Sequence, residues 1–450
     1  MPGLLEFSCM AETIVALASG VGRAGIAVIR LSGPSVRFGL ETIAGDVPQP
    51  RRAALRRLKD PKSGEVLDEA LVLFFPGPAS FTGEDVAELQ VHGGRAIISG
   101  VIAALAALPG FRLAERGEFT RRAVANGRMD LTSAEGIASL VEAETSSQRR
   151  QALRQAGGAL ERVAMTWRQR LAALLALMEA EIDFPDEEDV PALFASVRAG
   201  AGTLLAEIRA ALAGARNGER LREGAVMVIA GPPNAGKSTL LNALAQRDVA
   251  IVSPIAGTTR DTLEVHLDLG GYPVTLIDTA GLRETADMVE AIGVERAKAS
   301  LDRADLVIWL EADDARAAPP VVPAPLMRVL TKQDDSQYPL PQGLLPGGFE
   351  LGLSARSGAG MPTLLERLEQ AARAALESGE TALVTRERHR RELETVTAHL
   401  ATVQAADEAT PVEFVAEDLR LAVRAIGRLT GRVDIDEIYD VIFREFCIGK

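Results

Sequence analysis

Eight consecutive residues of this 450-residue chain have the types and spacing that hold a polyphosphate. The run Gly231–Ser238 fits the pattern G-x-x-x-x-G-K-[ST], with an apolar stretch of strand length before it and helical spacing after it. Glycines let the backbone curl and aim its N–H groups inward, and the N-terminus of the helix adds partial positive charge. Lys237 can reach the terminal phosphates, and the Ser238 hydroxyl can bind Mg²⁺. We therefore predict a phosphate-binding loop.

Two later stretches can complete a site for phosphate and metal. In Thr258-Thr259-Arg260-Asp261 a hydroxyl can complete Mg²⁺ coordination only while a γ-phosphate is present, which predicts a nucleotide-dependent switch. A buried strand then ends in Asp278-Thr279-Ala280-Gly281. We expect Asp278 to hold the metal through water and the Gly281 N–H to contact the γ-phosphate.

The next two stretches identify the base. The strand-like run Leu326–Leu330 leads into Thr331-Lys332-Gln333-Asp334, and Ser354-Ala355-Arg356 follows the next predicted strand. Guanine offers N1–H and N2–H₂ to one carboxylate, which Asp334 can supply, whereas adenine lacks both donors. Thr331 stands where asparagine is commoner, but five motifs in this order predict a site for GTP.

Hydrolysis of GTP needs a positioned water and a countercharge. Leu282 occupies the position where Ras-like enzymes have a glutamine, and no arginine is an obvious countercharge within the chain. Two carboxylates, Glu284 and Glu290, are candidates for orienting water. Alternatively, Asn234 of the phosphate loop can help to hold a monovalent cation near the phosphates.

The elements around these motifs indicate three parts. Short apolar runs alternate with helices over about 222–375, which is typical of a doubly wound parallel sheet. Helical spacing precedes it in Ser133–Ala156, Ala159–Glu181 and Leu193–Leu212, and follows it in Glu387–Ala405, Val412–Leu429 and Asp434–Glu445. Because helices flank the sheet on both sides, we predict a GTPase domain inserted into one helical bundle.

The first 125 or so residues are expected to form a small α/β unit. Strand-like runs lie at Thr13–Ala18, Gly25–Leu31, Leu71–Pro76 and Glu88–His92, a helix at Ala96–Leu108, and a surface hairpin or loop at Pro48–Lys62. The fold class is thus α/β plus α, with an N-terminal α/β domain, a discontinuous helical bundle and an inserted Ras-like P-loop domain.

Composition limits the alternatives. The net charge of −13 argues against broad non-specific binding of nucleic acid, although a local basic patch stays possible. Two cysteines, Cys9 and Cys447, predict a reducing compartment, and the absence of a signal or membrane-spanning run predicts a cytoplasmic protein without membrane contact. The acidic run Asp183–Asp189 is interpreted as a solvated helix break.

Several motifs together resemble one family. The phosphate loop, Ala256–Asp261 and Asp278–Glu284 are similar to those of the tRNA-modifying GTPases of the MnmE (TrmE) type. The resemblance extends over the whole chain, through Phe81–Asp85, His92–Gly94, Gly117–Thr120, Ile182–Pro185 and the terminal Cys447-Ile448-Gly449-Lys450.

The resemblance implies an N-terminal folate-binding and dimerising domain (1–127), a helical domain in two parts (128–220 and 377–450) and a GTPase domain (221–376). It implies a homodimer that works on tRNA with an FAD-dependent partner of the MnmG (GidA) type, with FAD entering only through that partner. The product would be an aminomethyl or carboxymethylaminomethyl group on C5 of the wobble uridine, position 34. Its one-carbon unit would come from a reduced folate, as formyl- or methylene-tetrahydrofolate.

The resemblance also assigns site residues by position. Potassium, which promotes pairing of GTPase domains in this family, would be held by Asn234, Ser253, Ile255 and Thr258. Magnesium would be held by Ser238 and Thr259, water by Glu290, and folate by Arg30, Glu88, Arg128 and Lys450. Lys237 would be catalytic. The nucleotide would contact three groups of residues. They are Asn234, Ala235, Gly236, Lys237, Ser238 and Thr239 of the phosphate loop; Asp278, Thr279, Ala280 and Gly281; and Thr331, Lys332, Asp334, Ser354, Ala355 and Arg356 around the base. Two positions depart from the family pattern: Arg128 replaces a lysine, and Arg116 replaces a proline before Gly117.

Some interpretations stay open at this point. Without the family, Arg30 and Glu88 would serve equally well as solvated rim charges. His92 can take part in chemistry, cap a turn or pack in the interior, and Cys447 can be a nucleophile or a small apolar residue. For the whole chain, the alternatives are a GTPase switch in ribosome assembly without folate chemistry, and a dimeric scaffold with a degenerate site. Intact Lys237, Ser238 and Asp278 argue against the scaffold.

Overall fold

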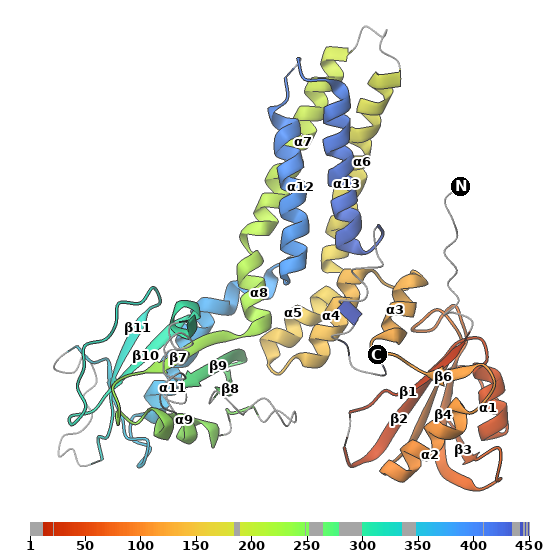
Figure 1. Cartoon of the computed structure of the whole chain (residues 1–450), viewed down its shortest axis with the longest axis horizontal. Coiled ribbons are helices and arrows are strands. Elements are labelled where there is room, and N and C mark those ends of the chain that lie inside the picture. The colour runs from red at the N-terminus through yellow and green to blue at the C-terminus, as the bar shows by residue number, and fades with distance from the viewer. Residues whose placement is uncertain are drawn as a thin grey trace, which may run out of the picture. The chain divides into compact units, whose positions relative to one another are not determined.

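The computed structural model describes residues 12–20, 22–183, 190–247, 249–251, 264–278, 299–334, 348–407, 409–433, 442–443, 446 and 449, without the side chains of 190–192. The chain divides into two compact units, Met1–Ala138 with Gly427–Lys450, and Ser139–Ile426. Figure 1 shows the elements of both. No helix within the described ranges is long and apolar enough to cross a membrane.

A six-stranded sheet forms the centre of the first unit. Its strands are β1 (Thr13–Leu17), β2 (Ala24–Ser32), β3 (Ala54–Lys59), β4 (Val66–Phe75), β5 (Val86–Gly93) and β6 (Phe111–Leu113), in the order β3-β4-β5-β2-β1-β6. All neighbours are antiparallel except β1 and β6. The four predicted strands are confirmed, and the turn-rich segment Pro48–Lys62 contributes β3, which forms a hairpin with β4.

Helices cover the two faces of this sheet unequally. Alternate strand residues pack with α1 (Val36–Ala44) and α2 (Arg95–Ala106) in one aliphatic core. On the other face, Phe119 of α3 (Glu118–Ala125) packs on Ile14 and Ala16 of β1. Farther along that face, Ile26, Leu55 and Leu71 remain exposed.

The end of the chain belongs to the same unit. Phe443 and Phe446 pack with Leu131 in a small apolar cluster, with ring centroids 5.2 Å apart. A Cβ atom on Gly117 would stand 2.9 Å from the carbonyl oxygen of Phe443. Most of the predicted helix Asp434–Glu445 lies outside the described residues.

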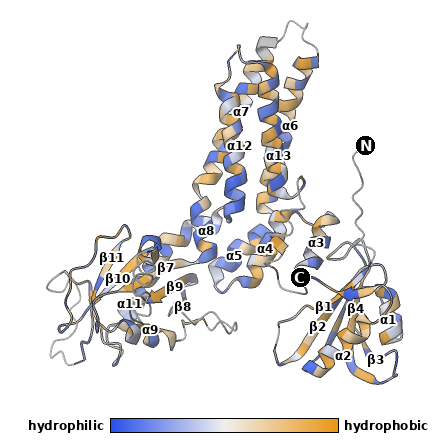
Figure 2. Cartoon of the chain, viewed as in Figure 1, coloured by the Kyte–Doolittle hydropathy of each residue, from blue (hydrophilic) through white to orange (hydrophobic). Residues whose placement is uncertain are grey.

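Long helices form a bundle in the second unit (Figure 1). They are α6 (Ala159–Asp183), α7 (Val190–Ala213), α12 (Glu387–Ala405) and α13 (Val412–Thr430), preceded by α5 (Ser146–Ala156). Helix α4 (Leu131–Glu142) begins in the first unit and ends in the second. His399 meets Asp418 at 2.8 Å and joins α12 to α13. Figure 2 shows hydrophobic and hydrophilic residues interspersed along each bundle helix, as expected for helices that bury one stripe.

One helical prediction is wrong in detail. The segment Ser133–Ala156 is expected to continue as one helix, but the structure breaks it between α4 and α5. Thr145 begins α5 with a capping box, in which its hydroxyl accepts from the N–H of Gln148 and the Gln148 side chain accepts from the N–H of Thr145. This reciprocal pair satisfies helix-end donors and makes a new start favourable.

The second sheet, also in this unit, is the predicted doubly wound one. Its strands are β7 (Ala225–Ala230), β8 (Glu264–Leu269), β9 (Tyr272–Asp278), β10 (Leu306–Glu311), β11 (Leu326–Leu330) and β12 (Leu351–Gly352), in the order β12-β11-β10-β7-β9-β8. Only β8 and β9 are antiparallel. Helices α8 (Ala215–Glu223), α9 (Lys237–Ala245), α11 (Met361–Leu376) and the 3₁₀ helix η3 (Glu377–Thr381) surround its aliphatic core.

Candidate functional site

The phosphate loop runs from β7 to α9. Gly231 lies so close to β10 that a Cβ atom on it would stand 2.2 Å from the carbonyl oxygen of Leu310. Asn234 and Gly236 have left-handed backbones, with φ of 61° and 89°, and Gly236 caps α9. Left-handed residues within a loop turn successive N–H groups to one side and create a concave site for anions.

Lys237 and Ser238 begin α9, and neighbouring groups orient both side chains. The Lys237 ammonium donates to the carbonyl oxygens of Gly231 and Pro232, at 3.0 and 2.9 Å. The Ser238 hydroxyl donates to Oδ2 of Asp278 at 2.8 Å, and Asp278 is fully buried at the end of β9. A hydroxyl beside a carboxylate is a pair of oxygen ligands suited to Mg²⁺.

The base loop is tied to the phosphate loop. Thr331 is almost fully buried, and its hydroxyl oxygen lies 2.7 Å from the carbonyl oxygen of Ala235 and 3.0 Å from that of Glu311. The exposed Lys332 has a left-handed backbone and pairs through its ammonium with Asp314, at 2.7 and 2.9 Å. Asp314, which was not predicted, lies in a tight turn after β10 that is closed by the bridge between Ala312 and Ala315.

The structure also joins the two predicted base-binding stretches. The hydroxyl of the buried Ser354 donates to the carboxylate of Asp334. The same hydroxyl oxygen accepts from the N–H of Ser357 at 3.0 Å, which holds the tight turn that contains the half-buried Ala355 and the exposed Arg356. Asp334 itself is exposed, as a residue that meets a ligand must be.

The other predicted residues of the nucleotide site divide into two groups. Thr239 is described and is exposed on the first turn of α9. The remaining predicted residues of this site lie outside the described residues: Ser253, Ile255, Thr258, Thr259, Thr279, Ala280, Gly281, Leu282, Glu284 and Glu290.

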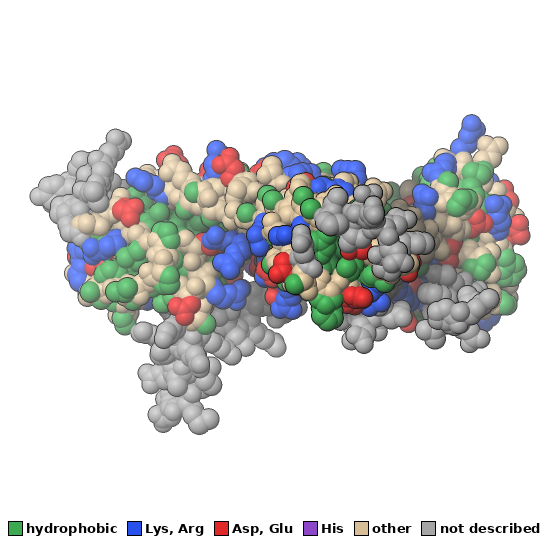
Figure 3. All heavy atoms as spheres, turned by 90° about the horizontal axis from the view of Figure 1, so that it is seen from above, with side chains coloured by type: hydrophobic (Ala, Val, Ile, Leu, Met, Phe, Trp, Pro, Cys, Tyr) green, Lys and Arg blue, Asp and Glu red, His purple; other side chains and the backbone are tan. Residues whose placement is uncertain are grey.

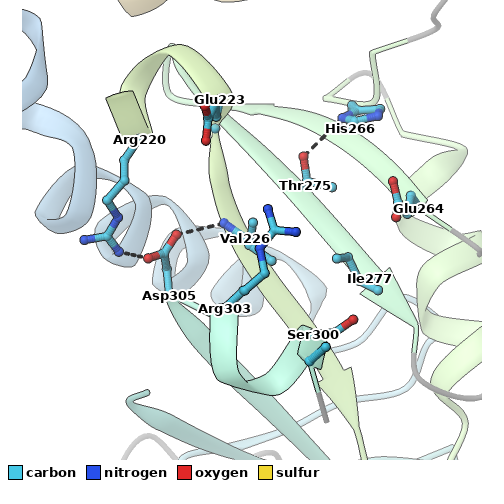
Figure 4. Close-up of a pocket in the computed structure, with 12 residues that line it drawn as sticks. Arg220, Glu223, Val226, Glu264, His266, Thr275, Ile277, Ser300, Arg303 and Asp305 are labelled. Atoms are coloured by element: carbon cyan, nitrogen blue, oxygen red, sulfur yellow. Dashed lines mark hydrogen bonds and ion pairs between the residues drawn. The ribbon is translucent and has the colours of Figure 1, made fainter. Parts of the chain in front are cut away.

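A polar hollow of about 720 Å³ lies elsewhere on this sheet. Figure 4 shows Arg220 and Asp305 paired at its edge, with Asp305 also accepting from the N–H of Val226 at 2.9 Å. On its floor Thr275 meets Nδ1 of His266 at 3.2 Å. Val226 and Asp305 mark the amino ends of β7 and β10, whereas ligands of such sheets bind at the carboxyl ends. The hollow is therefore not the nucleotide site.

In the first unit, the structure brings Arg30 and Glu88 together across β2 and β5. Nε and Nη2 of Arg30 donate to Oε1 of Glu88, at 3.0 and 2.8 Å. The guanidinium also lies over the rings of Phe81 and Phe119, 5.4 and 5.8 Å from their centroids. Both charged side chains are about a fifth exposed, so this is a half-buried, preoriented pair rather than two solvated rim charges.

Two further segments approach this pair. Nε of Arg128 donates to the carbonyl oxygen of Ser80 at 3.2 Å, in the loop that carries Phe81. Gly449 lies against the end of β1, where a Cβ atom would stand 2.0 Å from the carbonyl oxygen of Leu17. Leu17 is next to Ala16, the partner of Arg30 on β2. Lys450 and Cys447 lie outside the described residues.

His92 is oriented by Asp68. Its Nδ1 lies 2.8 Å from Oδ1 of Asp68, and its backbone N–H donates to Oδ2 at 2.8 Å. Burial raises the pKa of Asp68, but these hydrogen bonds outweigh burial and leave that pKa below its usual value. The imidazole itself is exposed, which removes the packed alternative for this histidine.

Sequence reasoning missed a buried ion network beside this region. Glu118 and Arg122, one helical turn apart on α3, are both almost fully buried and meet at 3.0 Å. Arg112 donates to Glu118 at 2.5 Å, and Arg122 reaches Glu84 at 3.1 Å. The spacing of Glu118 and Arg122 by four residues was a readable signal for the pair. Burial raises the pKa of Glu118, but both arginines and the N–H of Glu115 outweigh it and hold that pKa below 4.5.

Among the residues that the structure describes, no three His, Cys, Asp or Glu side chains gather as a metal site. Of the predicted metal ligands, Asn234 and Ser238 are described, and Asp278 lies beside Ser238.

A parallel sheet whose first strand leads into a phosphate loop, with joined base-binding loops, defines a Ras-like P-loop GTPase domain, here accompanied by a helical bundle and an N-terminal α/β domain. Family profiles described as "MnmE helical domain" and "GTP-binding protein TrmE N-terminus" match residues 131–447 and 13–128. The chain belongs to the MnmE family and is a GTPase that acts in tRNA modification.

Individual relatives are similar over nearly the full length. The tRNA modification GTPase MnmE of Methylorubrum populi is 54% identical over 98% of both chains. That of Beijerinckia indica is 53% identical over 100% of this chain and 98% of its own. Among solved structures, Era in complex with MgGDPNP and nucleotides 1506–1542 of 16S ribosomal RNA is 27% identical over 33% of this chain and 56% of its own. Its TM-score of 0.26 is too low to carry an inference.

Proposed function

We propose that this GTPase is the GTP-hydrolysing component of a complex that modifies C5 of the wobble uridine, position 34, in certain tRNAs. The group added is aminomethyl or carboxymethylaminomethyl, and its one-carbon unit comes from a reduced folate. The observation that carries this proposal is the preoriented Arg30–Glu88 pair. This second polar site lies in the unit that does not contain the phosphate loop. In the same unit, the C-terminal Gly449 lies against the carbonyl oxygen of Leu17 at the end of β1.

The proposed folate site uses complementary charges. Formyl- or methylene-tetrahydrofolate carries carboxylates, which suit Arg30 and Arg128, and a pterin ring with N–H donors, which suit Glu88. Lys450, next to Gly449, would supply a further cation from the C-terminus. A role of Cys447 as a nucleophile is part of the proposal.

At the nucleotide site, Lys237 neutralises the phosphates, while Ser238 and Thr259 hold Mg²⁺. Potassium would bind beside the phosphates to Asn234 and to the oxygen atoms of Ser253, Ile255 and Thr258. Glu290 would orient the attacking water. The remaining contacts of the nucleotide would be those proposed from the sequence: Ala235, Gly236, Thr239, Asp278, Thr279, Ala280, Gly281, Thr331, Lys332, Asp334, Ser354, Ala355 and Arg356.

A homodimer is part of the proposal, and the uncovered face of the first sheet supports it. Ile26 and Leu55 are each 62% exposed there, and Leu71 is 41% exposed. Leu55 is the register partner of Leu71, and Leu71 is that of Gln90, so these residues form a row across β3, β4 and β5. Leu55 and Leu71 are thus exposed apolar neighbours, and exposed apolar groups on one sheet face suit a second copy of the chain.

The further partners would be tRNA and an FAD-dependent protein of the MnmG (GidA) type, which alone would hold FAD. On the face seen in Figure 3, lysine and arginine side chains form separate clusters rather than one basic surface. Such clusters suit limited contacts to a folded RNA. We also propose a cytoplasmic location and the domain boundaries 1–127, 128–220, 221–376 and 377–450.

The test is nucleoside analysis of tRNA from a strain that lacks this protein, combined with folate binding by the purified chain. Loss of the modified wobble uridine and saturable binding of 5-formyl-tetrahydrofolate are expected. An Arg30→Ala variant should lose folate binding and retain GTP hydrolysis. Unchanged wobble uridines in the deletion strain would refute the proposed function.

A further inference from the structure

Thr331 connects three loops of the GTPase domain. Its backbone N–H donates to the carbonyl oxygen of Glu311 at 2.7 Å. Its hydroxyl oxygen lies 2.7 Å from the carbonyl oxygen of Ala235 and 3.0 Å from that of Glu311. The residue is only 3% exposed. The hydroxyl thus lies between the phosphate loop, the end of β10 and the base loop.

The hydroxyl of Thr331 has only one hydrogen to donate. A threonine hydroxyl carries one hydrogen, whereas the amide of asparagine, the commoner residue at this position, carries two. Two carbonyl oxygens already compete for the single hydrogen of Thr331. Turning that hydrogen toward a ligand would take the side-chain donor away from both carbonyls, at the cost of a buried unsatisfied acceptor.

Guanine presents a corresponding set of groups. N1–H and N2–H₂ are donors, and O6 and N7 are acceptors. In the proposed base site Asp334 accepts from the two donors, and main-chain N–H groups of the Ser354–Arg356 turn face O6. A donor to N7 would have to come from the side of the base nearest the phosphate loop, where Thr331 lies.

We propose that this GTPase does not recognise N7 of guanine, because the only side-chain hydrogen that Thr331 can donate is engaged by the carbonyl oxygens of Ala235 and Glu311. Specificity for guanine then depends on Asp334 and on the groups that face O6. The ligand class that follows is any guanine nucleotide altered at position 7, and 7-deaza-GTP is the simplest member. This inference rests on the proposed base site and adds a specificity to it.

The experiment is competition of GTP and 7-deaza-GTP against a fluorescent GDP on the purified full-length chain with Mg²⁺ present. We expect the two Kd values of the unaltered chain to agree within about twofold. In Thr331→Asn, the second amide hydrogen can reach N7, so GTP should be preferred over 7-deaza-GTP by about three- to tenfold, the range of one hydrogen bond. Thr331→Ser keeps one hydrogen and should show no preference.

Two controls separate the inference from the site on which it rests. An Asp334→Asn variant should lose GTP affinity and gain affinity for XTP, because xanthine presents a carbonyl where guanine has N2–H₂. If Asp334→Asn changes neither affinity, the base site itself is wrong. If that control behaves as expected and the unaltered chain binds 7-deaza-GTP tenfold or more weakly than GTP, N7 is read and the inference is overturned, whether or not Thr331→Asn folds.

Discussion

Gln151 and Gly379 lie 228 residues apart in the sequence, and the side-chain amide of Gln151 donates to the carbonyl oxygen of Gly379 at 3.0 Å. The same amide nitrogen donates to the carbonyl oxygen of Gly218, also at 3.0 Å. Gly218 belongs to α8, just before the chain enters the GTPase sheet, and Gly379 belongs to η3, just after it leaves. One side chain of α5 therefore fastens both connections of the inserted domain.

A Gln151→Ala change should destabilise this junction. Gln151 is almost fully buried, so its loss leaves two carbonyl oxygens without this donor. We expect a loss of about 2 kcal/mol in the free energy of unfolding, measured by urea denaturation of the full chain. Gln370→Ala is the matched control, because Gln370 is exposed on α11 and should change stability by less than about 0.5 kcal/mol. Equal effects of the two substitutions would contradict the assigned role.

The junction also shows which features could be predicted from the sequence. The motifs of the phosphate and base loops could be read because each is contiguous, and Glu387–Ala405 was predicted with its observed bounds because its apolar residues recur at helical spacing. The break before α5 was missed, although Thr145-Ser146-Ser147-Gln148 carries a capping-box pattern. The partners of Gln151 could not be predicted, since backbone carbonyl groups have no signature in the sequence.

In the candidate sites, too, contiguous motifs could be predicted from the sequence, whereas contacts that depend on the tertiary fold could not. Ser238 and Asp278 belong to known motifs, and their contact at 2.8 Å agrees with them. Asp314, which holds Lys332, lies in a turn 18 residues before it in the sequence, so their pairing depends on the tertiary fold. The Glu118–Arg122 pair was visible as a spacing, but its burial became evident only from the packing of α3 on the sheet.

Glu118 should make the first unit sensitive to acid. Its pKa is lower in the folded chain than the ordinary 4.5, so its stabilising contribution is present above about pH 5 and is lost as the pH falls through the depressed folded pKa. Glu118→Gln should therefore destabilise the chain by about 3 kcal/mol at neutral pH, because it breaks a buried ion pair. The difference from the unaltered chain should shrink as the pH falls through the depressed folded pKa of Glu118, as measured by urea denaturation at several pH values.

The control for this substitution is Glu65→Gln. Glu65 is exposed in the same unit, and its carboxylate forms no ion pair with the described residues. Its replacement should leave stability unchanged at every pH. A Glu118→Gln effect that stays constant from neutral to acid pH would show that packing, rather than charge, is responsible.

Gly449→Ala should displace the C-terminal segment. The added Cβ atom would stand 2.0 Å from the carbonyl oxygen of Leu17, and the backbone φ of 96° is unfavourable for alanine. We expect the modified wobble uridine to fall about tenfold or more in cells that carry this variant, while GTP hydrolysis by the purified chain is retained. Gly20→Ala is the control, since nothing lies within 4 Å of its Cβ position. If cells with Gly449→Ala keep the full level of modified wobble uridine, the C-terminal segment takes no part in the proposed chemistry.

Potassium should accelerate GTP hydrolysis. The proposed cation site includes Asn234, whose left-handed backbone lies within the phosphate loop, and a bound cation would supply the countercharge that the missing arginine does not. At equal ionic strength, the rate of GTP hydrolysis should be about tenfold or more higher in KCl than in NaCl. Asn234→Ala should remove that difference while GTP binding persists. Equal rates of the unaltered chain in both salts would exclude the cation site.

Ser238→Ala should weaken GTP binding only when Mg²⁺ is present. The Ser238 hydroxyl lies 2.8 Å from the buried carboxylate of Asp278, and the metal would take its place between these oxygen atoms and the phosphates. Removing the hydroxyl deletes one oxygen ligand, so we expect the Kd for GTP to rise about tenfold or more with Mg²⁺ and to stay unchanged in EDTA. Thr363→Ala, an exposed hydroxyl loss on α11, is the control and should leave both Kd values unchanged. If Ser238→Ala weakened binding equally in EDTA, its role would be to shape the loop, since the metal could not account for the loss.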